Sequence, residues 1–421
     1  MQGFDTFTMI IAASAVIIIS YVFNMVSKRT NIPSVLLLIV LGIVIRLALG
    51  IDGSRFFSVL EILGNVGLIM IVLEAALDLE LTKEKWPIIW KSFVVALLGL
   101  FGSTLFAAMV LSFFLQLELA QSIVYAVPLG IMSSAIIIPS VASLSHDKKE
   151  FMIYESTFSD ILGIMLFYFL LENLGNDNTQ DIVVGISSNI FITIFLSLIL
   201  SYGLILIFQK IKTQVKLFFL ISILTLLYAI GKKFHLSSLI IILIFGLILN
   251  NEKLFFRGFM RKWINSNSIR EILHDFHLIT MESAFVVRTF FFVIFGISIS
   301  LLSLLNIEYA IISLFVILGI YLVRFGVLKV FKSKSMKPEV YIAPRGLITI
   351  LLFYAIPAEL QSEKFSESIL LFTIIISSLI MTFSLIKHAA KENDDTEADS
   401  DELSSPSSNL VGGNENLNDK H

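Results

Sequence analysis

The chain has 421 residues, of which 57% are hydrophobic and only 15% are charged, and its mean hydropathy is +0.90. Soluble domains average about 45–50% apolar and about 25% charged residues, so this composition excludes a water-soluble globular protein and indicates an integral membrane protein. The net charge of −3 argues against nucleic-acid binding, which requires a basic surface. The absence of cysteine excludes disulfides, cysteine-based metal sites and thiol catalysis.

The first apolar run lies between Asp5 and the pair Lys28 and Arg29. It has no basic residue in front of it, which a cleaved signal peptide would have. We interpret it as a retained membrane helix whose N-terminus lies outside.

Apolar runs of about 20 residues, the length that crosses the hydrocarbon core, recur along the chain. Reading them between polar residues predicts an all-α polytopic membrane protein with about thirteen transmembrane helices. The predicted helices are 5–27, 31–50, 56–80, 87–116, 121–145, 151–173, 180–209, 214–233, 236–250, 276–300, 307–331, 338–358 and 367–388.

Loop charges support this count. With the N-terminus outside, most Lys and Arg residues fall in loops on the inner side, which is the known bias of membrane proteins. The outer loops carry only Arg55, Lys232, Lys233 and Lys364. We therefore expect a multi-pass protein of the cell membrane with a cytoplasmic C-terminus.

Two segments lack the apolar composition of a transmembrane helix. Residues 251–275 mix basic and aromatic side chains, which predicts an amphipathic piece at the inner membrane surface. Residues 389–421 are rich in acidic residues, Ser and Asn, and we predict a disordered acidic cytoplasmic tail there. The transmembrane domain is then residues 1–388.

Ionisable residues inside a span are costly, and each is a functional candidate. The richest segment contains Glu155, Ser156, Ser159 and Asp160. Ser156 and Asp160 are four residues apart and share one helix face, whereas Glu155 points elsewhere. Asp160 falls near mid-membrane depth, where desolvation penalises the charged form, so it can hold either a proton or a desolvated cation. The alternative is that Asp160 only bonds a neighbouring helix.

Two prolines interrupt predicted spans at matching places. Pro139 lies in the fifth span and Pro344 in the twelfth. Paired interruptions of this kind indicate two inverted repeats, here of about six helices each, with the binding site between the broken helices. The alternative for each proline is an ordinary kink. Grouped by repeat, a core contains residues 87–173 and 307–388, and a scaffold contains residues 5–80 and 180–300.

Four stretches, in order along the chain, carry a family resemblance: Asn31–Leu36 with Leu41–Gly42, Leu73–Leu79, Glu155–Asp160 and Pro344–Leu347. Together they resemble the monovalent cation/proton antiporter superfamily, and its sodium/proton exchanger branch more than its potassium-efflux branch. The resemblance covers residues 5–388.

The resemblance implies roles for individual residues. Asp160 takes the place of the carboxylate that alternates between cation and proton, and Ser156 takes that of a hydroxyl ligand. Glu155 is expected to pair with Arg345. Arg324 matches an arginine of exchangers that are thought to be electroneutral and would compensate charge, although it could also reach the inner surface as a snorkelling side chain. A homodimer is implied as well.

The chain also departs from the family pattern. Where the family has Thr-Asp before the proline of the fifth span, this chain has Ile137 and Ile138, and Ser159 replaces an asparagine. We expect oxygen ligands from Ser159 and from backbone carbonyls at the break, such as that of Ile137. The alternative source of oxygen is the hydroxyl groups of Ser133, Ser134 and Ser140. Binding could then be weak, altered in selectivity or partly water-mediated.

Other polar groups have plainer interpretations. Glu74 and Asp78 are expected to be structural or gating residues, Arg288 to make a cross-helix contact, and His274 and His277 to lie on a solvated face rather than bind a metal.

The expected function is exchange of a monovalent cation for a proton by alternating access. Sodium is the first choice, with lithium or potassium as possibilities. No cofactor and no enzymatic activity are expected. The alternatives are a divergent relative that has lost or altered exchange, a membrane-embedded transferase, and a channel; among the spans no Asp-rich loop favours the transferase.

Overall fold

The structure is a computed structural model, and it describes residues 6–30, 32–50, 57–141, 144–173, 179–210, 216–233, 238–256, 258–298, 306–331 and 336–404. Within these ranges the chain is helical with short connections and no β-strand. The helices are α1 (Thr6–Thr30), α2 (Ser34–Leu49), α3 (Phe57–Asp78), α4 (Trp86–Leu115), α5 (Leu119–Gly130), α6 (Ser134–Ser140), α7 (His146–Asn173), α8 (Thr179–Phe208), α9 (Lys216–Lys233), α10 (Ser238–Asn250), α11 (Glu252–Phe255), η2 (Gly258–Trp263), α12 (Ser266–Ser298), α13 (Ile307–Phe331), η4 (Glu339–Tyr341), α14 (Leu347–Tyr354), η5 (Ala358–Leu360) and α15 (Glu367–Ser404).

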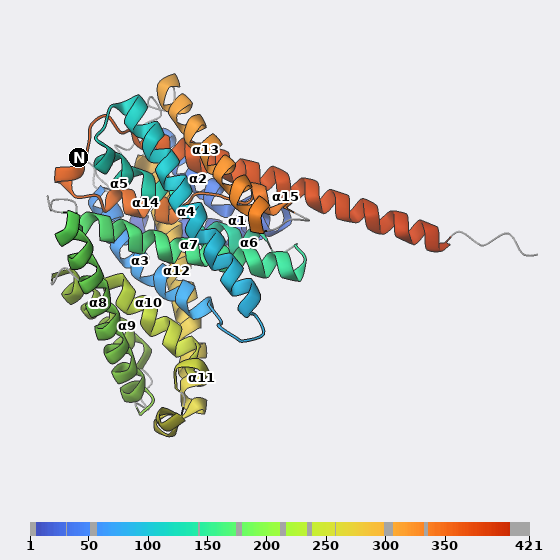
Figure 1. Cartoon of the computed structure of the whole chain (residues 1–421). Coiled ribbons are helices and arrows are strands. Elements are labelled where there is room, and N and C mark those ends of the chain that lie inside the picture. The colour runs from blue at the N-terminus through green and yellow to red at the C-terminus, as the bar shows by residue number, and fades with distance from the viewer. Residues whose placement is uncertain are drawn as a thin grey trace, which may run out of the picture.

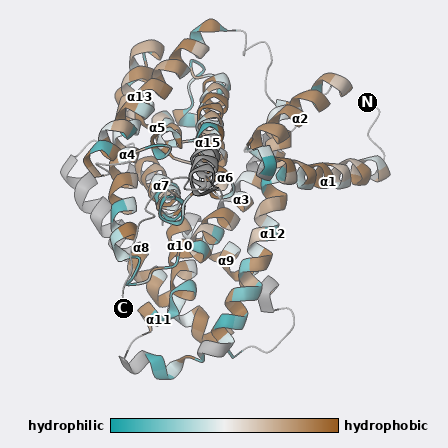
Figure 2. Cartoon of the chain, turned by 90° about the vertical axis from the view of Figure 1, so that its right-hand side faces the viewer, coloured by the Kyte–Doolittle hydropathy of each residue, from teal (hydrophilic) through white to brown (hydrophobic). Residues whose placement is uncertain are grey.

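These helices confirm the all-α membrane fold. Among the described residues, seven helices are long and apolar enough to cross a membrane, and four shorter apolar helices accompany them. Large apolar side chains such as those of Phe113 and Phe383 are exposed on the outside of the bundle, where lipid rather than water is the fitting solvent. Figure 2 shows how hydrophobic residues extend over the helix surfaces. The exact number of thirteen spans stays a prediction.

The helices pack in two neighbourhoods. In one, α4 packs against α5, α7 and α13, and α13 packs against α15. In the other, α12 packs against α2 and α3, and α10 packs against α3, α8 and α9. Figure 1 shows α8, α9 and α10 side by side at one end of the molecule, with α5 and α13 at the other.

The contact between α2 and α12 depends on two glycines. A Cβ atom at Gly42 would collide with the carbonyl oxygen of Val293 and lie 2.9 Å from Gly296 Cα. Small residues of this kind allow membrane helices to approach closely, since van der Waals packing drives their association. Glycine is therefore required here by the neighbouring backbone.

We expect Gly42→Ala to lower the unfolding temperature of the purified protein in detergent by several degrees, because backbone cannot give way as a side chain can. Gly99→Ala is the matched control, since no atom lies within 4 Å of a Cβ at this helical position. Alanine is favoured over glycine in a helix, so the control should be neutral or slightly stabilising. Equal melting shifts for the two variants would contradict the close approach.

Two interrupted segments meet inside the bundle. Residues Ile131–Ser133 separate α5 from α6, and residues Ile342–Gly346 separate η4 from α14. The Ser133 N–H donates to the carbonyl of Pro344 at 2.9 Å, so the two breaks are bonded to each other. The predicted interruptions of the fifth and twelfth spans are confirmed.

The position of the first break corrects one expectation. Pro344 lies in its break as predicted, but Pro139 lies inside α6, six residues beyond Ser133. The break forms where other elements satisfy the freed backbone groups: Ser159 Oγ accepts the Met132 N–H, and Asp160 accepts the Ser134 N–H. Tertiary partners, rather than the proline, decide where the helix stops.

The C-terminal helix also differs from the expectation. The helix α15 continues to Ser404 and projects past the other helices in Figure 1. Residues 389–404 are therefore helical rather than disordered, consistent with the good helix formers Ala, Lys and Glu at 389–392. The remainder of the predicted tail, residues 405–421, lies outside the described residues.

Candidate functional site

Asp160 lies where α7 passes the break between α5 and α6. Its side chain is 2% exposed. One carboxylate oxygen, Oδ2, accepts the backbone N–H of Ser134 at 3.2 Å, whereas Oδ1 is buried without a hydrogen-bond partner. A buried acceptor without a partner is costly, and a proton or a cation would satisfy it.

Hydroxyl oxygens without partners lie on the elements next to this carboxylate. Ser133 Oγ, beside Ser134 in the break, and Thr157 Oγ1, one turn before Asp160 on α7, are buried and have no hydrogen-bond partner. A third such oxygen, Thr349 Oγ1, is on α14, which packs against α7. Hard cations bind through several oxygen atoms, and these groups are of the right type.

The structure gives different positions to the other predicted ligands. Ser156 is fully buried, and its hydroxyl donates to the carbonyl of Ile153 in its own helix at 3.1 Å. Ser159 Oγ accepts the Met132 N–H at 2.9 Å, so it holds the break open. Ile137 lies in α6, and its carbonyl accepts the Val141 N–H at 3.0 Å. That carbonyl belongs to a helix rather than to the break, which corrects the expectation of a free backbone ligand.

The residues at the break are Ser133 and Ser134, not Ile137 and Ile138. The comparison with the family places the apolar pair at the site and names Ser133, Ser134 and Ser140 as further sources of oxygen. Of these three serines, Ser133 and Ser134 lie at the break, whereas the Ser140 hydroxyl donates to the Ile136 carbonyl of its own helix.

We expect Ser133→Ala to weaken apparent cation affinity several-fold with little change in thermal stability. The hydroxyl has no partner in the protein, so its loss removes a ligand without breaking a hydrogen bond. Ser140→Ala is the control, because its Oγ bonds only the Ile136 carbonyl of the same helix, at 2.7 Å. Cation titrations of proton flux check this; equal affinities for Ser133→Ala and the wild type would remove Ser133 from the ligand set.

Glu155 pairs with Arg324, not with Arg345 as expected. Arg324 Nη1 lies 2.6 Å from Glu155 Oε1, and Nη2 lies 3.2 Å from Oε2, so the pair is bidentate. Both side chains are buried, and Arg324 also donates to the carbonyl of Glu339 through Nε and Nη2. This pair ties α7 to α13 and to the segment before the second break. Arg324 is therefore not a snorkelling side chain.

Arg345 serves the backbone instead. It is 1% exposed and donates to three carbonyls, those of Leu129 at 2.7 Å, Gly130 at 3.3 Å and Ala343 at 2.7 Å. The first two are the last carbonyls of α5, which have no partner within the helix. A positively charged guanidinium group at a helix C-terminus is also stabilised by the negative end of the helix dipole. Arg345 thus closes α5 at its break.

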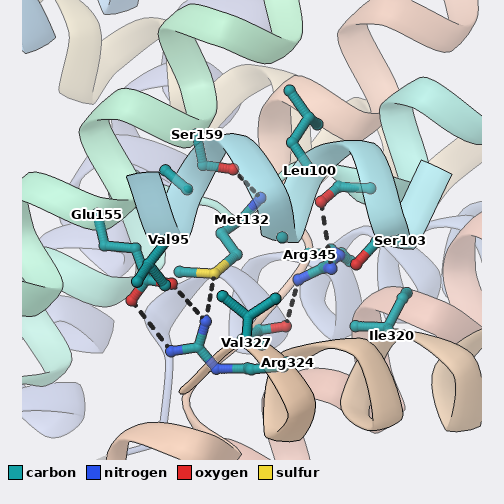
Figure 3. A pocket seen from close by; sticks show the side chains of 14 residues that line it. Val95, Leu100, Ser103, Met132, Glu155, Ser159, Ile320, Arg324, Val327 and Arg345 are labelled. Carbon is teal, nitrogen blue, oxygen red and sulfur yellow. Dashed lines mark hydrogen bonds and ion pairs between the residues drawn. The ribbon is translucent and has the colours of Figure 1, made fainter. Parts of the chain in front are cut away.

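A small cavity lies between α4, α7, α13 and the two breaks. It has a volume of about 20 Å³, enough for a water molecule. Figure 3 shows Glu155 and Arg324 facing each other at one side of it, with the Met132 sulfur beside the guanidinium group and Arg345 farther along. Asp160 is not among the residues that line it. The cavity therefore borders the ion pair rather than the candidate carboxylate.

The sequence model of one known family matches most of this chain. The model described as sodium/hydrogen exchanger, transmembrane, matches residues 12–389. That range covers most of the chain, including both breaks and Asp160.

The chain belongs to the sodium/hydrogen exchanger family. No curated protein matches it. Solved structures of the sodium proton antiporter MjNhaP1 from Methanocaldococcus jannaschii are similar in fold. One, at pH 8, has a TM-score of 0.68 and 20% identity and covers 90% of this chain and 96% of that chain. A second, from an electron microscopy map, has a TM-score of 0.66 and 19% identity and covers 92% of this chain and 97% of that chain.

Membership in an exchanger family bears on the competing functions. The family is one of transporters, which supports cation/proton exchange and fits the expectation that the chain is not an enzyme. The resemblance noticed in the sequence is confirmed.

A second set of charged contacts joins α3 to α12. Arg288 is bidentate to Glu74, with Nη1 3.1 Å from Oε2 and Nη2 3.2 Å from Oε1. About one turn farther along α3 and about three turns away on α12, His277 Nε2 lies 2.7 Å from Asp78 Oδ1. The expected cross-helix contact of Arg288 is observed, and its partner is an acid that periodicity within one span could not identify. His277 contacts Asp78 rather than lying on a wholly solvated face.

Proposed function

We propose that this exchanger carries a monovalent cation, sodium first, against a proton, and that both compete for Asp160. The observation that supports it most directly is the buried Asp160 carboxylate at the break, with Oδ1 unpartnered and hydroxyl oxygens on the adjoining elements. An unpaired carboxylate is too costly to leave buried without a proton or a cation. Mutual exclusion of the two ligands at one group couples their movements.

Exchange of one cation for one proton follows from this proposal. Two other acids, Glu155 on α7 and Glu74 on α3, are each paired with an arginine. Asp160 is then the carboxylate that changes its ligand in the cycle, and each crossing carries the same charge. Flux should be indifferent to a membrane potential set with potassium and valinomycin, provided sodium is the test cation.

Alternating access would move a core containing α4–α7 and α13–α15 against a scaffold containing α1–α3 and α8–α12. The packing neighbourhoods support this division. At least one contact crosses it: Tyr154 on α7 donates its hydroxyl to the carbonyl of Glu80, just after α3, at 2.7 Å. This bond must break when the core moves. We further propose a homodimer in the cell membrane, with the N-terminus outside as the loop charges indicate.

Calorimetry tests whether the cation and the proton compete for one site. Purified protein is titrated with sodium chloride in two buffers of equal pH and different ionisation enthalpies. The difference in heat gives the number of protons released per cation. We expect about half a proton released per cation at the pH where Asp160 is half protonated, a value approaching one at lower pH, and none with Asp160→Asn. Sodium binding that releases no proton at any pH would overturn the shared site.

A further inference from the structure

The connection between α10 and α12 forms an exposed basic face. Lys253 in α11 and Arg261 and Lys262 in η2 are exposed, as is Lys210 at the end of α8. These four residues are called the basic face below. Figures 1 and 2 both show α11 at one extremity of the molecule, beyond the ends of α8 and α10.

This face is held in place by specific hydrogen bonds. The Gln209 side chain donates to the carbonyl of Trp263 at 2.8 Å and accepts the N–H of Asn265 at 2.9 Å. Farther up α8, the Tyr202 hydroxyl donates to the carbonyl of Phe255 at 3.2 Å, and its ring packs edge-on against Phe256. Both ends of the connection are thus bound to α8, and the four cations are presented from an ordered surface.

The positive charge of the face is not compensated from within. None of its four cations forms an ion pair with a described residue. The 3-10 helix η2 contains no acid, and the nearest acid in sequence, Glu252, the first residue of α11, is buried.

Apolar side chains flank these cations. Trp263 is 52% exposed and Leu254 is 36% exposed. Tryptophan prefers the headgroup level of a bilayer, where its ring is half in hydrocarbon and half in the polar layer. Clustered Lys and Arg next to a transmembrane helix attract anionic lipid headgroups. The two features together fit a lipid surface better than a soluble partner.

We propose that Lys210, Lys253, Arg261 and Lys262 bind the headgroups of anionic phospholipids, with Trp263 inserted beside them at the membrane surface. The phosphodiester oxygens accept from the Lys and Arg side chains, and the acyl chains lie along Trp263 and Leu254. This selectivity for anionic over zwitterionic lipid is a property separate from ion exchange.

Tryptophan fluorescence tests this binding directly, because the chain has three tryptophans and only Trp263 lies at the face. Full-length protein carrying Trp86→Phe and Trp90→Phe is reconstituted into vesicles in which brominated lipid quenches nearby tryptophan. Brominated phosphatidylglycerol is compared with brominated phosphatidylcholine across mole fractions. We expect phosphatidylglycerol to be preferred at Trp263 by at least about fivefold, the equivalent of one basic residue near an anionic surface.

Substitutions test whether the basic face causes the preference for phosphatidylglycerol. Arg261→Gln with Lys262→Gln, in the same single-tryptophan background, should bring the ratio of the two lipids close to one. Lys83→Gln with Lys329→Gln removes the same charge from exposed positions elsewhere on the predicted inner side and should leave the preference intact. Equal quenching by both lipids in the starting protein, or an equal loss in both double variants, would overturn the proposal.

Salt provides a second readout that needs no variant. Raising choline chloride from 0.05 M to 0.5 M shortens the screening length to about 4 Å, so a preference based on charge should fall markedly. A preference for phosphatidylglycerol that is unchanged in high salt would contradict recognition by the basic face.

Discussion

Asp160→Asn should abolish cation-driven proton flux while leaving the protein folded and inserted. Asparagine keeps an oxygen that can accept the Ser134 N–H, and it is nearly the same size. It cannot bind and release a proton, so competition with a cation is lost. Since Oδ1 has no partner to lose, we expect a change in stability of no more than about 1 kcal/mol.

Ser159→Ala is the matched control on the adjacent residue. It removes the acceptor for the Met132 N–H without touching the carboxylate, so flux should be reduced but not abolished. Reconstituted vesicles containing equal amounts of each variant are compared for dissipation of a pH gradient on sodium addition. Sodium-driven flux by well-folded Asp160→Asn would rule out exchange at this carboxylate.

Breaking the Glu155–Arg324 pair should have the largest effect on stability. Removing one partner of a buried pair costs about 3–5 kcal/mol, because the other charge stays buried without compensation. Glu155→Gln and Arg324→Gln should therefore each lower the unfolding temperature strongly, and Arg324→Gln more so, since it also loses bonds to the Glu339 carbonyl. The double variant should cost clearly less than the sum of the two.

Arg345 supplies the control for this cycle. It contacts backbone carbonyls rather than the Glu155 carboxylate, so Glu155→Gln and Arg345→Gln should combine with much weaker coupling. Unfolding temperatures in one detergent and at one scan rate are compared for both cycles. Coupling that is stronger for Arg345 than for Arg324 would contradict the pairing in the structure.

Membrane class and helix positions follow from the sequence because they depend on local composition. The run at 87–116 becomes α4 at Trp86–Leu115, and the run at 307–331 becomes α13 at Ile307–Phe331. Apolar length alone decides these elements, since backbone groups in lipid must bond within the helix. The C-terminal end of α15 could not be predicted in this way, because the span predicted to lie in lipid ends at residue 388. Beyond that residue, helix propensity favours a helix while the polar composition favours disorder.

Partners across helices could not be derived in the same way. The periodicity of α7 separates the faces of Glu155 and Asp160, but it does not tell which arginine lies opposite. Arg324 lies in a continuous helix whose own carbonyls are satisfied, so its charge is available to a carboxylate. Arg345 lies in a break, where the freed carbonyls of α5 and of Ala343 occupy its donors. The choice of partner depends on the contact between the two breaks, which is a tertiary feature.

The same limit applies to the break itself. A proline indicates a disturbed helix, but the position of the disturbance depends on which side chains bond the freed N–H groups. Here Ser159 and Asp160 on α7 take the N–H groups of Met132 and Ser134. The residues Ser134, Ser159 and Asp160 can be read from the sequence, but their arrangement in space cannot.

Sodium-driven proton flux through the wild-type protein tests the central claim most directly. Purified protein is reconstituted into vesicles with an acidic interior, and recovery of a pH-sensitive dye is followed after addition of sodium, lithium, potassium or rubidium to the outside at several pH values. The account predicts saturable recovery with sodium, competition between protons and sodium, and no dependence on membrane potential. A folded wild-type protein that shows no recovery with any of the four cations would contradict it.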